Sequence, residues 1–272
     1  MNKENVFQLF SLKDKVAVIT GGAGMLGQEY AQILSDAGAR VVLFDVVPQK
    51  EIDSRIKAIA SPGRHIVGMT MDISKEKQVK EAVKKVVKKF GAIDILVNNA
   101  AATDFAGFKN SERFAPYEDF SLDIWEKEIG VGLTGTLICS QAVIPFMKKA
   151  KSGVIVNISS THGVIAPDNR IYGEGKFKAI TYPVIKSGIL GFTRAMASYL
   201  APYNVRVNSL VPGGVKAGYL DAQFEKDYSF RTMLGKMASK EDYKGAMLFL
   251  CSDASSYMTG SSLIIDGGWT AW

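Results

Sequence analysis

Val16-Ala17-Val18-Ile19-Thr20-Gly21-Gly22-Ala23-Gly24-Met25-Leu26-Gly27 is the stretch of sequence that decides the fold. It begins with apolar, mostly β-branched residues, a composition typical of a buried strand. The apolar run stops at Thr20-Gly21, and a helical pattern begins near Gly24. The stretch therefore predicts a strand, a glycine-rich turn and a helix, which is the opening unit of an α/β fold.

The glycine spacing in this turn is typical of a nucleotide-binding loop. Gly21 permits a tight turn, Gly24 allows the backbone to approach a pyrophosphate, and Gly27 allows the helix to pack closely on the strand. The first helical residues, Met25 and Leu26, belong to a helix N-terminus, whose free N–H groups and positive dipole end attract phosphates. We therefore predict that this loop binds a dinucleotide; a glycine-rich turn that binds nothing is the alternative.

The rest of the chain alternates strand-like runs with segments of helical length. Further strands are expected at 40–44, 64–70, 93–97, 153–158, 205–210 and 261–265. Strands separated by helices imply right-handed crossovers and a parallel sheet. We therefore predict a Rossmann-type, doubly wound parallel sheet with helices on both faces, in a single domain over residues 1–272.

Composition narrows the function classes. The 272 residues are 47% hydrophobic and 22% charged, which is ordinary for a globular protein. We expect no membrane-spanning run and no signal peptide, and we expect Cys139 and Cys251 to be free buried thiols in the cytoplasm.

The net charge of +6 does not indicate a nucleic-acid partner. Segment 75–89 holds seven lysines and two glutamates, so most of the excess charge lies there. Val79, Val83, Val86 and Phe90 recur at helical spacing and should face the core, which leaves the lysines in water. No aromatic residues alternate with these lysines to stack on bases.

Asp45 follows the second strand, 18 residues after Gly27. A carboxylate at this place accepts hydrogen bonds from the adenosine ribose hydroxyls and repels a 2′-phosphate. No lysine or arginine within 21–27 offsets that repulsion. We therefore expect NAD rather than NADP as the cofactor; a carboxylate that merely caps a strand end is the alternative.

Tyr182 and Lys186 provide the candidate chemistry. Residues four apart share one face of a helix, so the ammonium would lie near the phenol and favour its phenolate form. Combined with a nucleotide-binding loop, the pair indicates a tyrosine that transfers protons while nicotinamide transfers hydride. The sequence therefore predicts an enzyme.

Taken together, these residues resemble the classical short-chain dehydrogenase/reductase family over about 14–268. The matching pieces, in family order, are Thr20–Gly27, Asp72-Ile73, Asn98-Asn99-Ala100-Ala101, Asn157-Ile158-Ser159-Ser160, Tyr182-x-x-x-Lys186, Asn208 with Pro212-Gly213, and Asp266-Gly267-Gly268. The resemblance implies that Tyr182 is the catalytic acid or base, that Ser160 donates a hydrogen bond to the reacting oxygen, and that Lys186 also holds the nicotinamide ribose.

The resemblance implies further cofactor contacts and a homo-oligomer. Asp72 and Ile73 would contact adenine, and Asn98 would lie beside the adenosine-side ribose. The segment from Pro212 and Gly213 to the backbone of Val215 would meet the nicotinamide amide. Family members are usually tetramers or dimers, built from the two long helices around 122–150 and 182–202 and the C-terminal strand.

Three single residues depart from the family pattern. Met25 replaces the usual middle glycine of the loop. Gly132 stands where a catalytic asparagine usually supports a helix kink and a water that leads to the lysine. Ala217 replaces a threonine that meets the nicotinamide amide in many relatives.

Two enlarged loops and a predicted lid also set the chain apart. The loops, about 102–120 and 164–181, should lie at the carboxyl ends of strands and form substrate walls; simple loop growth is the alternative. Segment 216–240 should form a mobile lid, unless it only packs on the core.

The sequence says little about the substrate. His162, Arg170, Lys176 and Lys178 crowd one insertion, and Lys109 and Arg113 lie in the other. Such groups suit a phosphate, a carboxylate or sugar hydroxyls. The chain is also loosely similar to bacterial members linked to surface-sugar or flagellin modification. We therefore favour a small-molecule substrate such as a sugar or sugar phosphate, and no metal.

Two other functions remain open at this point. One is a reductase of 3-oxoacyl or other apolar ketones, which the aromatic residues of the lid segment would suit. The other is a protein that binds NAD without turnover, as a sensor or scaffold. The intact set of Ser160, Tyr182 and Lys186 disfavours that second alternative, because a binding module needs no acid or base.

Overall fold

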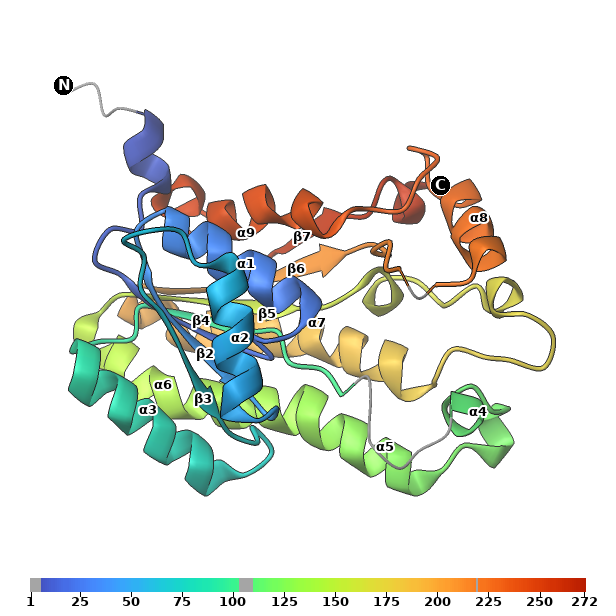
Figure 1. Cartoon of the computed structure of the whole chain (residues 1–272), viewed down its shortest axis with the longest axis horizontal. Helices are drawn as coiled ribbons and strands as arrows, with labels where there is room; N and C mark the ends of the chain where they lie inside the picture. The colour runs from blue at the N-terminus through green and yellow to red at the C-terminus, as the bar shows by residue number, and fades with distance from the viewer. Residues whose placement is uncertain (1–5, 103–109, 219) are drawn as a thin grey trace.

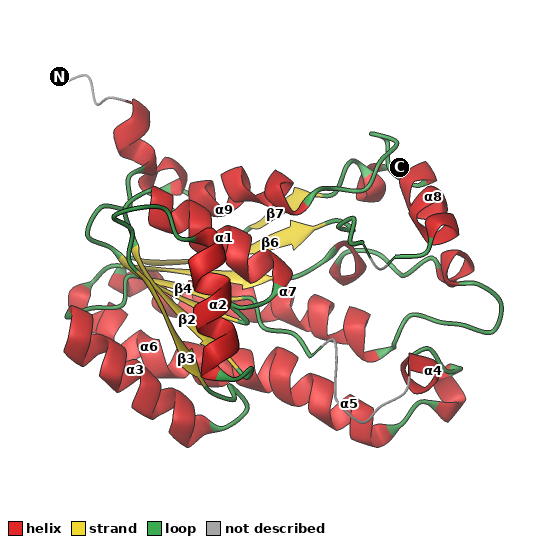
Figure 2. Cartoon of the chain, viewed as in Figure 1, coloured by secondary structure: helices red, strands yellow, loops and turns green. Residues whose placement is uncertain are grey.

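A seven-stranded parallel sheet forms the centre of the protein (Figures 1 and 2). The computed structural model describes residues 6–102, 110–218 and 220–272. The strands are β1 (Val16–Thr20), β2 (Arg40–Asp45), β3 (Ile66–Thr70), β4 (Ile95–Asn98), β5 (Gly153–Ile158), β6 (Val205–Pro212) and β7 (Ser262–Ile265). Their order is β3-β2-β1-β4-β5-β6-β7, and every neighbouring pair is parallel. The predicted doubly wound, Rossmann-type sheet is confirmed.

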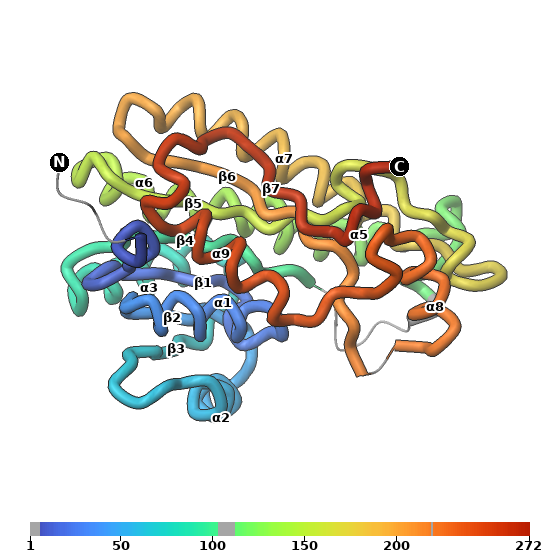
Figure 3. The backbone as a smooth tube through the Cα atoms, turned by 90° about the horizontal axis from the view of Figure 1, so that it is seen from above, coloured from blue at the N-terminus to red at the C-terminus, as the bar shows by residue number. Residues whose placement is uncertain are grey.

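Helices cover both faces of the sheet (Figure 3). The helices are α1 (Met25–Asp36), α2 (Gln49–Ile59), α3 (Glu76–Phe90), α4 (Asn110–Arg113), α5 (Leu122–Ile129), α6 (Thr136–Ala150), α7 (Thr181–Leu200), α8 (Ala222–Phe230) and α9 (Lys244–Cys251). Residues of α1, α2 and α9 share one hydrophobic core with the sheet, and residues of α3, α6 and α7 share the other. Cys139 and Cys251 are buried, one in each core, and unpaired, as predicted.

The strand sequences explain why both faces are covered. In β1, Ala17 and Ile19 point into the first core, whereas Val16 and Val18 point into the second. All five residues of this strand are buried. Because successive side chains of a strand point to opposite faces, a continuous apolar run requires a cover on each side.

The lysine-rich helix α3 has the predicted orientation. Val79, Val83 and Val86 are buried in the second core, while the lysines face solvent. Its charge therefore lies on a solvated surface and contributes little to the packing of the sheet.

One sequence-based expectation concerning membranes needs correction. By length and composition alone, Leu122–Ala150 qualifies as a membrane span. The segment comprises α5, a π-helical segment (Gly130–Gly135) and α6. Cys139, Val143 and Met147 of α6 lie in the second core. Its apolar character therefore has a structural explanation, because one side of the helix covers the central sheet.

The parallel arrangement brings distant residues to one edge of the sheet. Thr20, Asp45, Asn98, Ile158 and Pro212 end β1, β2, β4, β5 and β6. The carboxyl ends of parallel strands all point the same way, and the crevice outside them is where such sheets bind ligands.

Candidate active site

The glycine-rich loop has the backbone geometry that the sequence predicts. Gly21 has a φ of +61°, and a β-carbon there would lie 2.8 Å from Ala100 Cα. A β-carbon on Gly27 would collide with the carbonyl oxygen of Gly21. Helix α1 begins at Met25, and its N-cap residue, Gly24, has no side chain that could cap the first N–H groups of the helix. The helix N-terminus around Met25 and Leu26 is therefore free to bind a phosphate, and these residues fit a dinucleotide.

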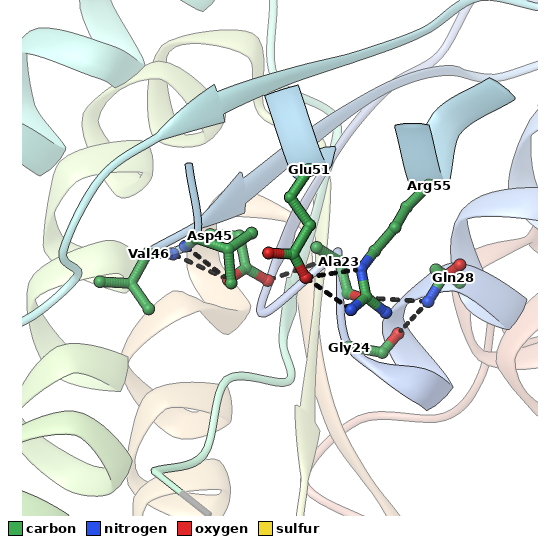
Figure 4. Close-up of polar contacts among 8 residues, drawn as sticks. Ala23, Gly24, Gln28, Asp45, Val46, Glu51 and Arg55 are labelled. Atoms are coloured by element: carbon green, nitrogen blue, oxygen red, sulfur yellow. Dashed lines mark hydrogen bonds and ion pairs between the residues drawn. The ribbon is translucent and has the colours of Figure 1, made fainter. Parts of the chain in front are cut away.

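Asp45 is tied to this loop (Figure 4). Its Oδ2 accepts a hydrogen bond from the Ala23 N–H at 2.9 Å, and its Oδ1 accepts one from the Val46 N–H at 2.8 Å. The carboxylate is therefore fixed at the end of β2, next to the glycine-rich loop. On the neighbouring helix α2, Arg55 is paired with Glu51 at 2.6 Å, which offsets its charge.

Two predicted adenine contacts lie at the next strand end. Asp72 accepts hydrogen bonds from the N–H and hydroxyl of Ser74, at 2.8 and 2.7 Å. Ile73 is buried and would be 2.7 Å from a β-carbon on Gly135. Both follow β3, near the edge where the predicted adenine site would lie.

Asn98 ends β4 with its side chain turned into the protein, and its position beside a ribose stays a prediction. Its side chain is only 4% exposed, and its Nδ2 donates to Asn157 Oδ1 at 2.8 Å and to Ser140 Oγ at 3.1 Å. Asn157 in turn donates to Thr193 Oγ1 on α7. Asn98 therefore joins β4 to β5 and to α6 inside the protein, because its side chain points into the sheet layer.

Asn99 instead contacts the loop, although the sequence pattern indicates no role of its own for it. Its Nδ2 donates to the carbonyl oxygens of Thr20 and Gly21, both at 3.0 Å. Its N–H donates to Thr20 Oγ1 at 3.0 Å. Successive side chains of a strand point in opposite directions. Since Asn98 points into the protein, the side chain of the next residue, Asn99, points toward the loop.

Tyr182, Ser160 and Lys186 lie together at the carboxyl end of β5. Burial raises the pKa of Tyr182, and a hydrogen bond with Ser160 opposes that rise. Lys186 Nζ donates to the carbonyl oxygen of Ile158 at 2.8 Å and lies 5.7 Å from the centroid of the Tyr182 ring. The structure thus brings the three predicted catalytic residues to one place.

A second lysine lies even closer to the tyrosine. Lys178 Nζ is 4.1 Å from the centroid of the Tyr182 ring. Burial lowers the pKa of Lys178 to about 8, and the nearby Arg113 adds to this effect. The pKa of Lys186 is also lowered to about 8, mainly by burial and in addition by the charge of Lys178. In the sequence, Lys178 is one of several basic residues of the loop; its spacing, four residues before Tyr182, is the signal that could have found it.

A buried ion pair borders the same site. Arg113 Nη2 lies 2.6 Å from Glu128 Oε1, and the Thr181 hydroxyl donates to Glu128 Oε2. Glu128 is 3% exposed. It lines a small pocket together with Gly132, Tyr182 and Lys186 among others. A carboxylate therefore lies near the place where the family's asparagine would act.

Gly132 has a packing reason to be glycine. It lies in the π-helical segment Gly130–Gly135, and a β-carbon there would lie 2.7 Å from Ile185 Cγ2. Ile185 therefore occupies the space that a larger side chain at residue 132 would need.

The predicted nicotinamide segment follows β6. A β-carbon on Gly213 would lie 2.8 Å from Asp266 Cα, and the Gly213 carbonyl accepts from the Tyr243 hydroxyl at 3.1 Å. Val215 forms a bridge with Ala238, and Ala217 is buried. Pro212, Gly213 and Val215 thus lie at the same sheet edge, with a fixed backbone.

The two enlarged loops contact each other and the predicted lid. The Phe177 N–H donates to the Phe114 carbonyl at 3.0 Å, which joins the loops. The Phe224 ring of α8 lies 5.4 Å from the Tyr172 ring. Asp168 pairs with Arg231 at 3.3 Å. Residues 103–109, with Lys109, and Tyr219 of the lid lie outside the described residues.

His162 lies between Tyr182 and the C-terminal segment. Its ring centroid is 6.1 Å from that of Tyr182 and 6.4 Å from that of Trp269. The side chain is 5% exposed, and its Nδ1 has no partner in the described part of the chain. Burial lowers its pKa to about 4, so the imidazole is neutral at pH 7. Across residues 6–102, 110–218 and 220–272, no cluster of acidic, His or Cys side chains is suited to a metal ion.

A family model described as "Enoyl-(Acyl carrier protein) reductase" matches residues 22–270. The chain belongs to the classical short-chain dehydrogenase/reductase family. Members of this family are oxidoreductases that use a nicotinamide cofactor, and the relatives include alcohol dehydrogenases and ketone reductases.

Known relatives of this short-chain dehydrogenase/reductase match 94% or more of its length. It is 35% identical to a 3-oxoacyl-[acyl-carrier-protein] reductase of Thermotoga maritima, over 94% of this chain and 98% of the relative. It is also 35% identical to the trans-4-hydroxycyclohexanecarboxylate dehydrogenase of Sinomonas cyclohexanicum, over 95% and 93%. Among solved structures, a gluconate 5-dehydrogenase of Burkholderia cenocepacia, in complex with NADP and tartrate, is similar. Its TM-score is 0.87 at 28% identity, over 98% and 100% of the chains.

Replacing Gly132 by alanine should destabilise the fold. The new β-carbon would overlap Ile185, and overpacking of this kind costs about 1–3 kcal/mol. Denaturant unfolding measures the loss. Gly130→Ala is the matched control, because a β-carbon there meets nothing within 4 Å. Equal stability of the two variants would contradict the packing role of Gly132.

Acid should destabilise the protein through His162. Its pKa is lowered from 6.5 to about 4 on folding. The unfolded state therefore binds more protons between these values, and stability falls as the pH drops from 6.5 to 4. The contribution reaches about 3 kcal/mol at pH 4. Denaturant unfolding should show that His162→Gln loses less free energy of unfolding than the wild type as the pH falls from 6.5 to 4. The exposed His65→Gln should behave as the wild type does; identical profiles for all three proteins would contradict this prediction.

Proposed function

We propose that this protein is an NAD-dependent oxidoreductase that interconverts a secondary alcohol and a ketone on a sugar or sugar-phosphate-like substrate. The observation that carries the proposal is the position of Tyr182, whose ring centroid lies 5.7 Å from the Lys186 ammonium and whose hydroxyl interacts with Ser160. Burial raises the pKa of this phenol, so proton exchange near neutral pH would require the Ser160 hydrogen bond, the charge of Lys186 and the bound cofactor to favour the phenolate.

The proposed mechanism assigns one task to each residue. The bound nicotinamide cofactor accepts or supplies the hydride. Tyr182 takes the proton of the substrate hydroxyl during oxidation and returns it during reduction. Ser160 donates a hydrogen bond to the reacting oxygen and so fixes its position. Lys186, whose Nζ lies 5.7 Å from the centroid of the Tyr182 ring, would favour the phenolate by its charge.

NAD is the proposed cofactor because of Asp45. The carboxylate is held at the end of β2 by the loop that would bind the phosphates. A 2′-phosphate placed there would be repelled by this charge. Arg55 offers little compensation, since it is paired with Glu51.

Polar residues around the site support a hydroxylated substrate. His162 and Lys178 lie next to Tyr182, and the charged pair of Arg113 and Glu128 borders it. The relatives include a gluconate 5-dehydrogenase and a hydroxycyclohexanecarboxylate dehydrogenase, both named for hydroxylated compounds. A sugar-like alcohol fits these neighbours.

A 3-oxoacyl or other apolar ketone is the second candidate. Tyr172, Phe224, Tyr228 and Trp269 form a continuous series of ring contacts near the site. The 35% identical reductase from Thermotoga maritima is named for a 3-oxoacyl substrate. A protein that binds NAD without turnover remains the alternative outside enzymes.

We also expect copies of this chain to form a homo-oligomer. Leu137 of α6, Val184 and Tyr199 of α7, and Ile264 of β7 are apolar and at least 39% exposed. They lie on the elements that family resemblance assigns to the interface, where association would bury them.

Tyr182→Phe should abolish turnover and leave NADH binding nearly unchanged. The substitution removes the proton-transferring hydroxyl while the ring still fills its place. Reduction of NAD⁺, followed by absorbance across sugars, sugar phosphates, simple alcohols and 3-hydroxyacyl thioesters, measures the activity. Tyr257→Phe, at a fully exposed site, is the control. Activity of Tyr182→Phe comparable with the control would exclude the acid–base role, and a wild type inactive on every compound would favour the non-catalytic alternative.

Replacing Asp45 by serine together with Val46→Arg should shift cofactor preference toward NADP. The change removes the repelling carboxylate and adds a cation at a side chain that is 69% exposed. The ratio of kcat/KM values for NADP⁺ and NAD⁺ should rise by about 10- to 100-fold, because the 2′-phosphate loses a repulsive charge and acquires an attractive one. Asp53→Ser, on the exposed side of α2, is the control. An unchanged ratio would show that Asp45 does not face the ribose.

A further inference from the structure

Lys178 is a cation at the reaction centre that the proposed mechanism does not use. Its Nζ lies 4.1 Å from the centroid of the Tyr182 ring, closer than the 5.7 Å of Lys186. The two lysines stand four residues before and four residues after the tyrosine. Only the second belongs to the motif that carries the family resemblance.

The loop that carries Lys178 is held in place by its backbone. The Lys178 N–H donates to Asn169 Oδ1 at 3.0 Å. The preceding residue, Phe177, donates its N–H to the Phe114 carbonyl at 3.0 Å. The next residue, Ala179, is buried. The side chain therefore starts from a fixed point, and its place over the tyrosine is a consequence of the enlarged loop.

The carboxylate of Glu128, whose charge acts on Lys178, is already engaged. Glu128 accepts hydrogen bonds from Arg113 with one oxygen and from Thr181 with the other. Lys186, the other nearby cation, donates to the Ile158 carbonyl. Within the described residues, Lys178 Nζ has ring contacts with Tyr172 and Tyr182, and no hydrogen-bond acceptor.

Ring contacts alone leave this ammonium incompletely satisfied. An ammonium carries three N–H donors, and the face of an aromatic ring attracts the charge without replacing three acceptor oxygens. The Lys178 side chain is half-buried, and this partial removal from water lowers its pKa. An anionic ligand group would supply the missing acceptors and the opposite charge.

We propose that Lys178 binds an anionic group of the substrate, a carboxylate or a phosphate located near the reacting secondary alcohol. The inference rests on the proposed function, because it assumes that the substrate oxygen lies at Tyr182. It narrows the substrate class from polar alcohols in general to hydroxy acids or sugar phosphates. It also assigns a specificity role to the enlarged loop 164–181.

Paired probes that differ in charge test the proposal. Comparison of D-gluconate with the neutral D-glucitol tests whether the site binds a carboxylate. Comparison of glucose 6-phosphate with the neutral glucose tests whether it binds a phosphate. Calorimetric titration of each probe into the protein–NADH complex measures binding whether or not turnover occurs. NAD⁺ reduction with the same probes measures kcat and KM separately. Each measurement is made on the wild type, Lys178→Met, Lys178→Arg and the matched control Lys176→Met, whose side chain is exposed in the same loop.

The expected result is a loss confined to anionic probes. In the wild type, either gluconate or glucose 6-phosphate should bind more tightly than its neutral partner. Preference for gluconate identifies a carboxylate site, and preference for glucose 6-phosphate identifies a phosphate site. Lys178→Met should weaken the binding of that anion by roughly 10- to 100-fold, which is the usual effect of losing one charged hydrogen bond. The affinity for the neutral partner should change by no more than about twofold. Lys178→Arg should retain most of the preference, and Lys176→Met should match the wild type.

Other outcomes overturn the proposal. Absence of any anion preference in the wild type does so, as does an equal loss on charged and neutral probes in Lys178→Met. That second pattern, with kcat reduced and KM unchanged, would mean that Lys178 acts only on the phenolate of Tyr182. Retained NADH binding shows that each variant is folded. The wild type could bind an anionic probe without turning over any probe. If Lys178→Met then loses that binding, the anion site is supported while the proposed reaction fails.

Discussion

Seven parallel strands covered on both faces impose the constraint on which the rest of the structure depends. Each strand must cross back through a helix, so all carboxyl ends lie at one edge. Asp45, Ser160 and Pro212 meet there although more than a hundred residues separate Asp45 from Ser160. The packing that buries Val16, Val18 and their neighbours thus also assembles the site. The loop of Gly21 and Gly27 then allows helix α1 to approach this edge closely.

Buried charge gives the assembled site its character. Two ammonium groups lie beside the Tyr182 ring, and a carboxylate paired with Arg113 lines the adjoining pocket. Removal from water lowers the pKa of both lysines to about 8, which reduces the energetic cost of bringing them together. The same removal from water makes each remaining charge act more strongly on the phenol than it would at the surface. The proposed proton transfer at Tyr182 and the proposed anion site at Lys178 therefore share one small region.

Particular residues show where sequence reasoning succeeds and where it stops. The glycine loop, Asp45 and the Tyr182–Lys186 pair follow from local spacing, and the structure places them together at one edge. The family pattern predicts Asn98 beside a ribose, yet its side chain joins β4, β5 and α6, while Asn99 contacts the loop. The direction of a side chain depends on strand register, which spacing alone does not give. Gly132 is visible in the sequence as a departure, but only the fold shows that Ile185 fills the adjacent space.

The sequence by itself determined the α/β class, the glycine-rich turn and the spacing of Tyr182 and Lys186, because each depends on residues close together in the chain. Tertiary structure decided which side chains surround that pair. Lys178 reaches Tyr182 because the enlarged loop is fixed to Asn169 and Phe114, and Glu128 lines the adjoining pocket from α5. Contacts of this kind arise from loop closure and packing between distant segments. Their energies depend on burial, which exists only once the chain has folded.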